Sequence, residues 1–180
     1  MSLVLSKAIR LVDLVAAGAN TLNALAAASE MSRSTTHRLL ATLVEHGYLA
    51  IEDKKYVLGF RLLELGEQKR RSLSFLEVLR PILVRYAAET CDTIHLAVLD
   101  GTDIVLLDRV FGDRQLRINS YPGLRNTAFM TAVGKVLIGN LPPKRWPSFV
   151  AGVPPAYPRS VEAILADFER ARQSNIAMDM

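Results

Sequence analysis

The order of local signals in the first sixty residues limits the fold more than any other feature of this chain. Three segments with helical apolar periodicity each follow a hydroxyl residue that can cap a helix: Ser6, Thr21 and Ser32. We expect these helices to end near Gly18, Ser29 and Gly47. Two β-prone runs follow, separated by a charged turn at 52–55: Tyr48–Ile51 and Tyr56–Leu58. Three helices and a two-stranded hairpin predict a winged helix-turn-helix.

The third of these helices has the side chains that a DNA-reading helix needs. Its apolar face is expected to comprise Leu39, Leu40, Leu43 and Val44. Hydroxyl and basic side chains gather in its first one and a half turns: Arg33, Ser34, Thr36, His37 and Arg38. Backbone N–H groups at a helix start meet phosphate, and Arg or His one turn further on reaches base edges. Taken alone, the helix also fits an ordinary solvated face, but the helix before it and the hairpin after it favour the DNA interpretation.

In the hairpin turn, Lys54 and Lys55 are candidates for phosphate contacts, which position a protein on DNA without reading its sequence. As single residues they also fit plain turn positions. The charge balance permits this interpretation. The chain carries 22 Lys and Arg against 18 Asp and Glu. Residues 1–72 hold 10 basic and 7 acidic side chains, a balance of +3, whereas residues 73–180 hold 12 and 11, a balance of +1.

Residues 60–72 look helical and become wholly polar, as a linker does. Ser74 and Glu77 have the spacing of a capping box, opening a helix that runs to about Thr90. Three strands are then expected, with an Asp100–Gly101 turn between the first two: 93–99, 104–110 and 116–120. Further on we expect helices at about 131–140 and 161–173, an irregular proline-rich stretch at 142–159, and a strand beginning at Ile176–Met178.

Composition excludes several classes of protein. The single cysteine, Cys91, excludes a disulfide framework and a multi-cysteine zinc site, and it suits a reducing compartment. No apolar run is long enough to span a bilayer, and the N-terminus lacks signal-peptide features, so we expect a cytoplasmic protein without a membrane partner. Cys91 and His95 lack a third, orienting group, and His37 and His46 lie nine apart rather than four. We therefore expect no enzyme, no metal site and no cofactor.

Seven segments, in this order, resemble the IclR family of bacterial transcriptional regulators: Leu5–Val15, Ser34–Leu49, Tyr56–Gly59, Arg80–Leu83, Thr93–Gly101, Leu107–Val110 and Thr131–Lys135. The resemblance covers about residues 3–179. It implies an α+β chain with a winged helix-turn-helix DNA-binding domain at 3–65, a linker helix at 66–79 and a GAF-like α/β effector-binding domain at 80–180. It further implies that the family's domain continues beyond this chain with strands that complete the sheet and the pocket.

The resemblance also implies partners and sites. A double-stranded, palindromic DNA operator, a small organic effector and a homodimer that assembles into a pair of dimers are expected. The DNA-reading positions fall on Arg33, Ser34, Thr35, Thr36, His37 and Arg38. The effector pocket falls on Leu116, Ile118, Phe129, Thr131, Ala132 and Val133, where plain core packing is the alternative. Two departures stand out: Phe129 replaces a frequent histidine, and residues 142–147 replace an acidic helix.

An effector carboxylate is expected on the N–H groups at the start of the helix that follows Thr131. One alternative function stays open at this point: a DNA-binding module with a truncated, non-functional sensor that acts as a passive repressor.

Overall fold

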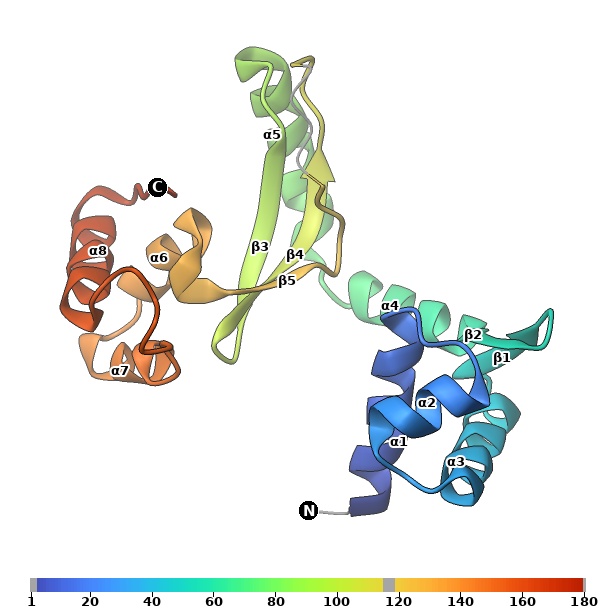
Figure 1. Ribbon diagram of the computed structural model, residues 1–180. Helices are drawn as coiled ribbons and strands as arrows, with labels where there is room; N and C mark the ends of the chain where they lie inside the picture. Colours follow the sequence, from blue (N-terminus) through green and yellow to red (C-terminus); the bar gives the residue numbers. More distant parts are fainter. Residues whose placement is uncertain (1–2, 115–118, 180) are drawn as a thin grey trace. The chain divides into compact units, whose positions relative to one another are not determined.

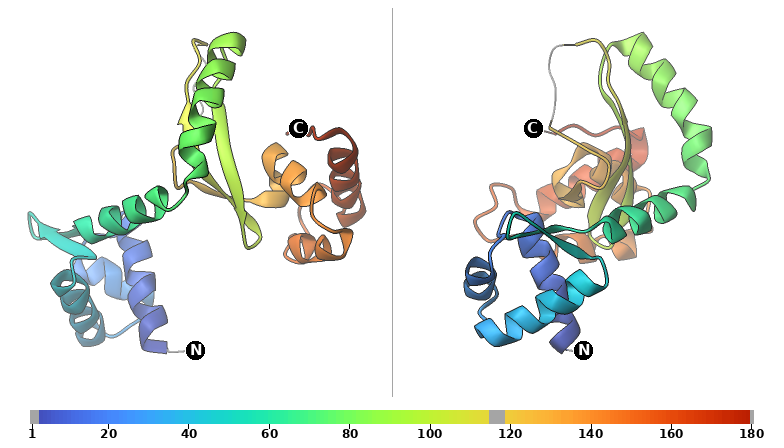
Figure 2. Two further views of the ribbon diagram at one scale, coloured as in Figure 1. Left: turned by 180° about the vertical axis from the view of Figure 1, so that it is seen from behind. Right: turned by 90° about the vertical axis from the view of Figure 1, so that its right-hand side faces the viewer.

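The computed structural model describes residues 3–114 and 119–179, and the chain divides into two compact units, residues 1–73 and 74–180 (Figures 1 and 2). Each unit has its own buried apolar cluster. We describe each one by itself.

The first unit contains four helices and a two-stranded antiparallel sheet: α1 (Leu3–Ala16), α2 (Leu22–Ser29), α3 (Arg33–Glu45), β1 (Leu49–Glu52), β2 (Lys55–Leu58) and α4 (Phe60–Arg71). The predicted winged helix-turn-helix is confirmed. Thr21 and Ser32 cap α2 and α3 as expected, each accepting a hydrogen bond from the backbone N–H three residues on. The expected start of α1 was wrong, because this helix begins at Leu3 and Ser6 lies inside it.

The core of the first unit joins all three N-terminal helices to the wing. Its fully buried leucines come from α1, α2, α3 and β1: Leu11, Leu25, Leu40 and Leu49. The backbone of Gly59 passes so close to that of Gly47 that a Cβ on Gly59 would lie 2.0 Å from the Gly47 carbonyl oxygen. Only glycine fits there. This contact fixes the hairpin β1–β2 against the end of α3.

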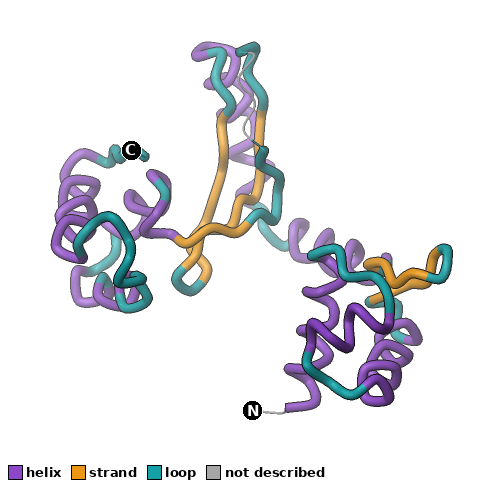
Figure 3. The backbone as a smooth tube through the Cα atoms, in the orientation of Figure 1, coloured by secondary structure: helices purple, strands orange, loops and turns teal. Residues whose placement is uncertain are grey.

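The second unit packs helices on an antiparallel three-stranded sheet with the order β3 (Ile94–Asp100), β4 (Asp103–Val110) and β5 (Arg125–Thr127) (Figure 3). The other elements in its described residues are α5 (Phe75–Thr90), α6 (Ala132–Gly139), α7 (Pro147–Val150), α8 (Val161–Ser174) and the short 3₁₀ turns η1 (Ala128–Met130) and η2 (Pro143–Arg145). A buried cluster joins β3 and β4 to the helices that follow the sheet; its largest members include Phe129, Ile138, Trp146 and Phe168. Helix α5 lies along the hairpin β3–β4 (Figure 2).

Several expected elements of the second unit differ from the observed ones. The linker helix expected at 66–79 is two elements, because α4 ends at Arg71 and α5 begins at Phe75. Ser74 makes no side-chain cap hydrogen bond, so the expected capping box is not formed. The proline-rich stretch holds η2 and α7, and Ile176–Met178 is not a strand. The strand expected at 116–120 falls largely outside the described residues, and Asn119 and Ser120 are not in a strand.

Candidate nucleic-acid interface and effector site

The start of α3 is held by its own hydroxyl side chains. Ser32 Oγ accepts a hydrogen bond from the N–H of Thr35 at 3.3 Å and donates to Thr35 Oγ1 at 2.9 Å. The Thr36 hydroxyl donates to the Ser32 carbonyl at 3.0 Å. These contacts fix the first turn of the helix, whose N–H groups carry the positive end of the helix dipole.

Four of the six expected DNA-reading side chains are exposed on one side of this helix: Arg33, Ser34, His37 and Arg38. Among the described residues, none of these four is in an ion pair with an acid. Thr35 is half-buried. Thr36 has no exposed surface. The prediction that it reads DNA is therefore wrong, and Thr36 is a buried residue on the inward face of α3. The periodicity of α3 already indicates this, because Thr36 lies four residues before Leu40, on the same face.

A further polar residue, Asn23, takes part in this surface and was missed from the sequence. Arg33 donates a hydrogen bond from its guanidinium to Asn23 Oδ1 at 2.8 Å, joining the start of α2 to the start of α3. Beside this pair lies a shallow hollow of about 660 Å³, lined by Leu22, Arg33, Ser34 and His37. The two helix starts thus share one exposed basic and hydroxyl surface.

The wing presents its two lysines to solvent. Lys54 and Lys55 are exposed at the tip and the start of β2. Asp53 and Lys54 both have positive φ angles, 47° and 62°, as a two-residue hairpin turn requires. The N–H of Tyr56 donates to the Asn20 carbonyl at 2.8 Å, so the wing is tied to the loop between α1 and α2.

The expected effector residues lie in different settings. Leu116 and Ile118 lie outside the described residues. Thr131 caps α6, its Oγ1 accepting from the N–H of Gly134 at 3.1 Å; Ala132 is half-buried and Val133 is exposed. Phe129 is 4% exposed and packs edge-on against Tyr157, with ring centroids 5.3 Å apart. It is a core residue, which corrects its assignment as an effector contact.

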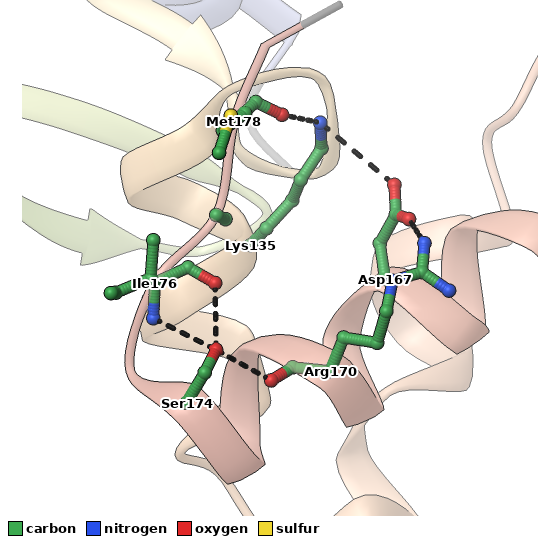
Figure 4. A pocket seen from close by; sticks show the side chains of 7 residues that line it. Lys135, Asp167, Arg170, Ser174, Ile176 and Met178 are labelled. Carbon is green, nitrogen blue, oxygen red and sulfur yellow. Dashed lines mark hydrogen bonds and ion pairs between the residues drawn. The ribbon is translucent and has the colours of Figure 1, made fainter.

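A cavity of about 390 Å³ lies instead at the far side of α6, between α8 and the segment after it (Figure 4). Its lining includes Lys135, Asp167 and Arg170. Lys135 is buried, and its ammonium donates to the Met178 carbonyl at 2.9 Å and lies 3.9 Å from Asp167. Arg159 and Arg170 also pair with Asp167, and chiefly the hydrogen bond from Arg159 lowers the pKa of that carboxyl. Three cations thus share the carboxylate of Asp167, and Lys135 also lies 3.6 Å from Asp179; these contacts join α6 to α8.

The pair Cys91 and His95 does not form a nucleophile and base in the described structure. The exposed Cys91 lies with Sγ 3.9 Å from the Ala88 carbonyl, whereas His95 Nε2 lies 2.7 Å from Ser120 Oγ. Burial, and then the charge of Arg109, lowers the pKa of His95 below its ordinary value, which favours the neutral imidazole. No group of three metal-ligating side chains occurs within residues 3–114 and 119–179. None of the described helices is long and apolar enough to cross a membrane.

These features define a class: a winged helix-turn-helix protein with an attached α/β domain. Comparison with known proteins gives the family. Residues 4–52 match the IclR helix-turn-helix domain, and residues 69–180 match the bacterial transcriptional regulator IclR C-terminal domain. The chain belongs to the IclR family of transcriptional regulators.

Two curated relatives and two solved structures illustrate the similarity. The chain is 32% identical to XynR of Escherichia coli over 83% of its length and 62% of that protein, and 33% identical to KdgR of E. coli over 77% and 53%. A Rhodococcus regulator structure superposes with a TM-score of 0.75 at 27% identity, covering 99% of this chain and 74% of that one. A homologue from Microbacterium hydrocarbonoxydans, solved with 4-hydroxybenzoate, gives 0.77 at 21% identity, covering 95% and 74%. The chain thus spans less than two thirds of either curated relative.

Proposed function

We propose that this chain is a sequence-specific DNA-binding regulator of transcription that places α3 in the major groove. The observation that carries the proposal is the exposed surface of Arg33, Ser34, His37 and Arg38 on a helix that is capped at Ser32 and anchored by Leu40 in the core. Donor side chains of this kind reach the acceptors of guanine and adenine edges, and the helix start contacts phosphate. Lys54 and Lys55 in the wing add phosphate contacts.

The DNA-bound form is proposed to be a homodimer on a palindromic operator, with a pair of dimers as the larger assembly. Exposed apolar side chains on α1 and α4 support self-association: Leu3, Val4, Leu5, Ile9, Phe60 and Leu63. Two copies related by a two-fold axis place their recognition helices in successive major grooves, about 34–36 Å apart. The operator is then two inverted half-sites at that spacing.

A small organic carboxylate is the proposed effector of the second domain. The Microbacterium homologue was solved with 4-hydroxybenzoate, a compound of this class. The expected contacts are Thr131, Ala132 and Val133 at the start of α6, together with Leu116 and Ile118. Control of a metabolic operon follows from such an effector.

A gel-shift titration tests the DNA-binding function. The probe is the DNA upstream of the chain's own gene, with unrelated DNA of the same length as competitor, at about 0.15 M salt, where non-specific binding is weak. A complex that survives the competitor supports the proposal. Equal competition by the unrelated DNA contradicts it.

A second function, a DNA-binding module without a working sensor, is favoured by the burial of Phe129 in the core. Calorimetry with aromatic and short aliphatic carboxylates separates the two. A complex with one carboxylate per chain contradicts the hypothesis of a module without a working sensor. The absence of a binding heat with every carboxylate contradicts the hypothesis of an effector-binding domain.

A further inference from the structure

An irregularity in the hairpin β3–β4 decides which side chains share the face of the sheet that bears the core. Ala97 pairs with Leu106, but Leu96 pairs with Asp108, so β4 has one extra residue at Leu107. Such a bulge shifts the alternation of side chains by one residue, so that residues beyond it point to the face opposite to the one that regular alternation would give them. Asp108 is thereby directed to α5, where it pairs with Arg80 at 2.5 Å. Arg109 is directed to the opposite face, which also bears the buried side chains of Ile104 and Leu106.

On that face, a polar cluster extends the apolar core toward the open end of the hairpin. Arg109 pairs across the strands with His95. Ser120 is buried, and its hydroxyl lies 2.7 Å from His95 Nε2 and accepts a hydrogen bond from Arg109 at 3.3 Å. The guanidinium of Arg109 stacks on the Phe111 ring, 4.0 Å from its centroid. We call His95, Arg109, Phe111 and Ser120 the hairpin cluster.

The hairpin cluster has a positive charge without a negative one. Among the described residues, the Arg109 guanidinium pairs with no carboxylate. The neighbouring Asp108 accepts from the backbone N–H of Arg109 at 2.8 Å, and its other oxygen pairs with Arg80 on the other face. This contrasts with Lys135, Arg159 and Arg170, each of which pairs with the carboxylate of Asp167. Within the described part of the chain, the half-buried guanidinium of Arg109 contacts the Ser120 hydroxyl and the Phe111 ring and no acid, and such an arginine fork can receive an anion.

We propose that the hairpin cluster binds the carboxylate of a small organic effector. The inference rests on the proposed function, in that the second domain senses such a molecule, but it assigns the carboxylate to Arg109 rather than to the start of α6. The guanidinium offers two parallel N–H donors to a carboxylate, and stacking on Phe111 holds the plane of that fork. At the start of α6, by comparison, Thr131 Oγ1 is already occupied by the N–H of Gly134, and no charged side chain faces a ligand there among the residues assigned to the pocket.

The test is calorimetric titration of the full chain with benzoate and isobutyrate, each compared with its neutral amide at constant ionic strength. At least one of the two carboxylates should bind with one site per chain, at least about tenfold more tightly than its amide, because charge-assisted hydrogen bonds to the arginine are lost with the charge. Arg109→Gln should weaken that binding at least tenfold. The matched control is Arg85→Gln, since Arg85 also stacks on a neighbouring ring, that of Tyr86, but lies on α5 and pairs with Glu89. It should bind within about twofold of wild type.

Equal affinity of Arg109→Gln and Arg85→Gln, or no saturable binding of either carboxylate to the wild type, overturns the inference. Nuclear magnetic resonance of the wild type tests it without any substitution. The carboxylate should shift the Arg109 Nε–H and His95 ring signals, and the amide should not; shifts confined to the amides of 131–133 would refute it. If the chain binds a carboxylate at Arg109 but does not bind operator DNA, this inference is supported and the proposed DNA-binding function is rejected. If it binds DNA but no carboxylate, this inference alone is rejected.

Discussion

At the scale of single residues, the side chains of α3 separate into those that we propose contact DNA and those that pack in the core of the first unit. Arg38 lies on the exposed side, one turn beyond Ser34. We expect Arg38→Ala to weaken operator binding by about 1–3 kcal/mol and to leave the fold intact, because a solvated helix face tolerates alanine. Fluorescence anisotropy titrations over a range of salt concentrations measure the binding constant. They also give the salt slope, which is the slope of the logarithm of the binding constant against the logarithm of the salt concentration.

Arg61→Ala is the matched control, since Arg61 is an exposed helical arginine of the same unit that pairs with Glu64. It should bind operator like the wild type. If Arg38 clamps phosphate, its loss reduces the salt slope by about one and weakens all DNA alike; if it reads a base, non-specific binding is unchanged. Operator binding by Arg38→Ala at full wild-type affinity would mean that Arg38 is only a surface charge.

Thr36 belongs to the opposite group. Thr36→Val keeps the shape of the side chain and removes the hydrogen bond to the Ser32 carbonyl, which still accepts from the N–H of residue 36. We expect the free energy of unfolding to fall by about 1 kcal/mol and the preference among DNA sequences to stay unchanged. Urea unfolding monitored by circular dichroism measures the first quantity. A change in the preferred operator base with undiminished stability would return Thr36 to the DNA-reading set.

At the scale of elements, Asp167 on α8 connects this helix to α6 through its ion pair with Lys135. Asp167→Asn removes the buried carboxylate that Lys135 shares with Arg159 and Arg170, and it leaves Lys135 only the exposed Asp179, 3.6 Å away. We expect this change to cost about 3–5 kcal/mol at pH 7. Trp146, the single tryptophan, is buried in the same unit, so its fluorescence in urea reports this unfolding.

The same carboxylate gives a pH dependence of known sign. Because the folded state lowers the pKa of Asp167, the stabilisation is present above the unfolded value of about 3.9 and is lost as the pH falls through the folded value. The difference in stability between wild type and Asp167→Asn should therefore be constant from about pH 5 to 8 and shrink below about pH 4. A difference that shrinks instead between pH 8 and 6 would contradict the role assigned to Asp167.

Most elements marked by local chemistry were predictable from the sequence, although Ser6 lies inside α1 and Ser74 makes no capping hydrogen bond. Elements that depend on distant contacts were not predictable. Thr21, Ser32, Thr131 and Ser160 stand at helix starts that the sequence placed within about one residue, since a cap is a local interaction. Strand β5 has only three residues and exists because it pairs with β4, so no local pattern indicated it. The bulge at Leu107 is likewise a property of two paired strands, and it alone directs Arg109 to the core face.

In the candidate sites, too, features set by local interactions were predictable, and features set by contacts between distant residues were not. The exposed side of α3 was predictable, because Ser32 and the apolar stripe through Leu40 define the orientation of the helix. Asn23 joins that surface only through the packing of α2 beside α3, ten residues away from Arg33. Phe129 was assigned to the pocket by position in a motif, but a motif does not state whether a ring faces a ligand or Tyr157.

At the scale of the whole molecule, the central claim is that two copies of the chain read two inverted half-sites through α3. The direct measurement is the affinity for a palindromic operator and for the same DNA with five base pairs inserted between the half-sites. Five base pairs rotate one half-site by about half a helical turn, so only one recognition helix can enter its groove. The account predicts tight binding of two chains to the first DNA and affinity near the non-specific level for the second, a loss of about 10³-fold or more. Equal affinity for the two DNAs would contradict it.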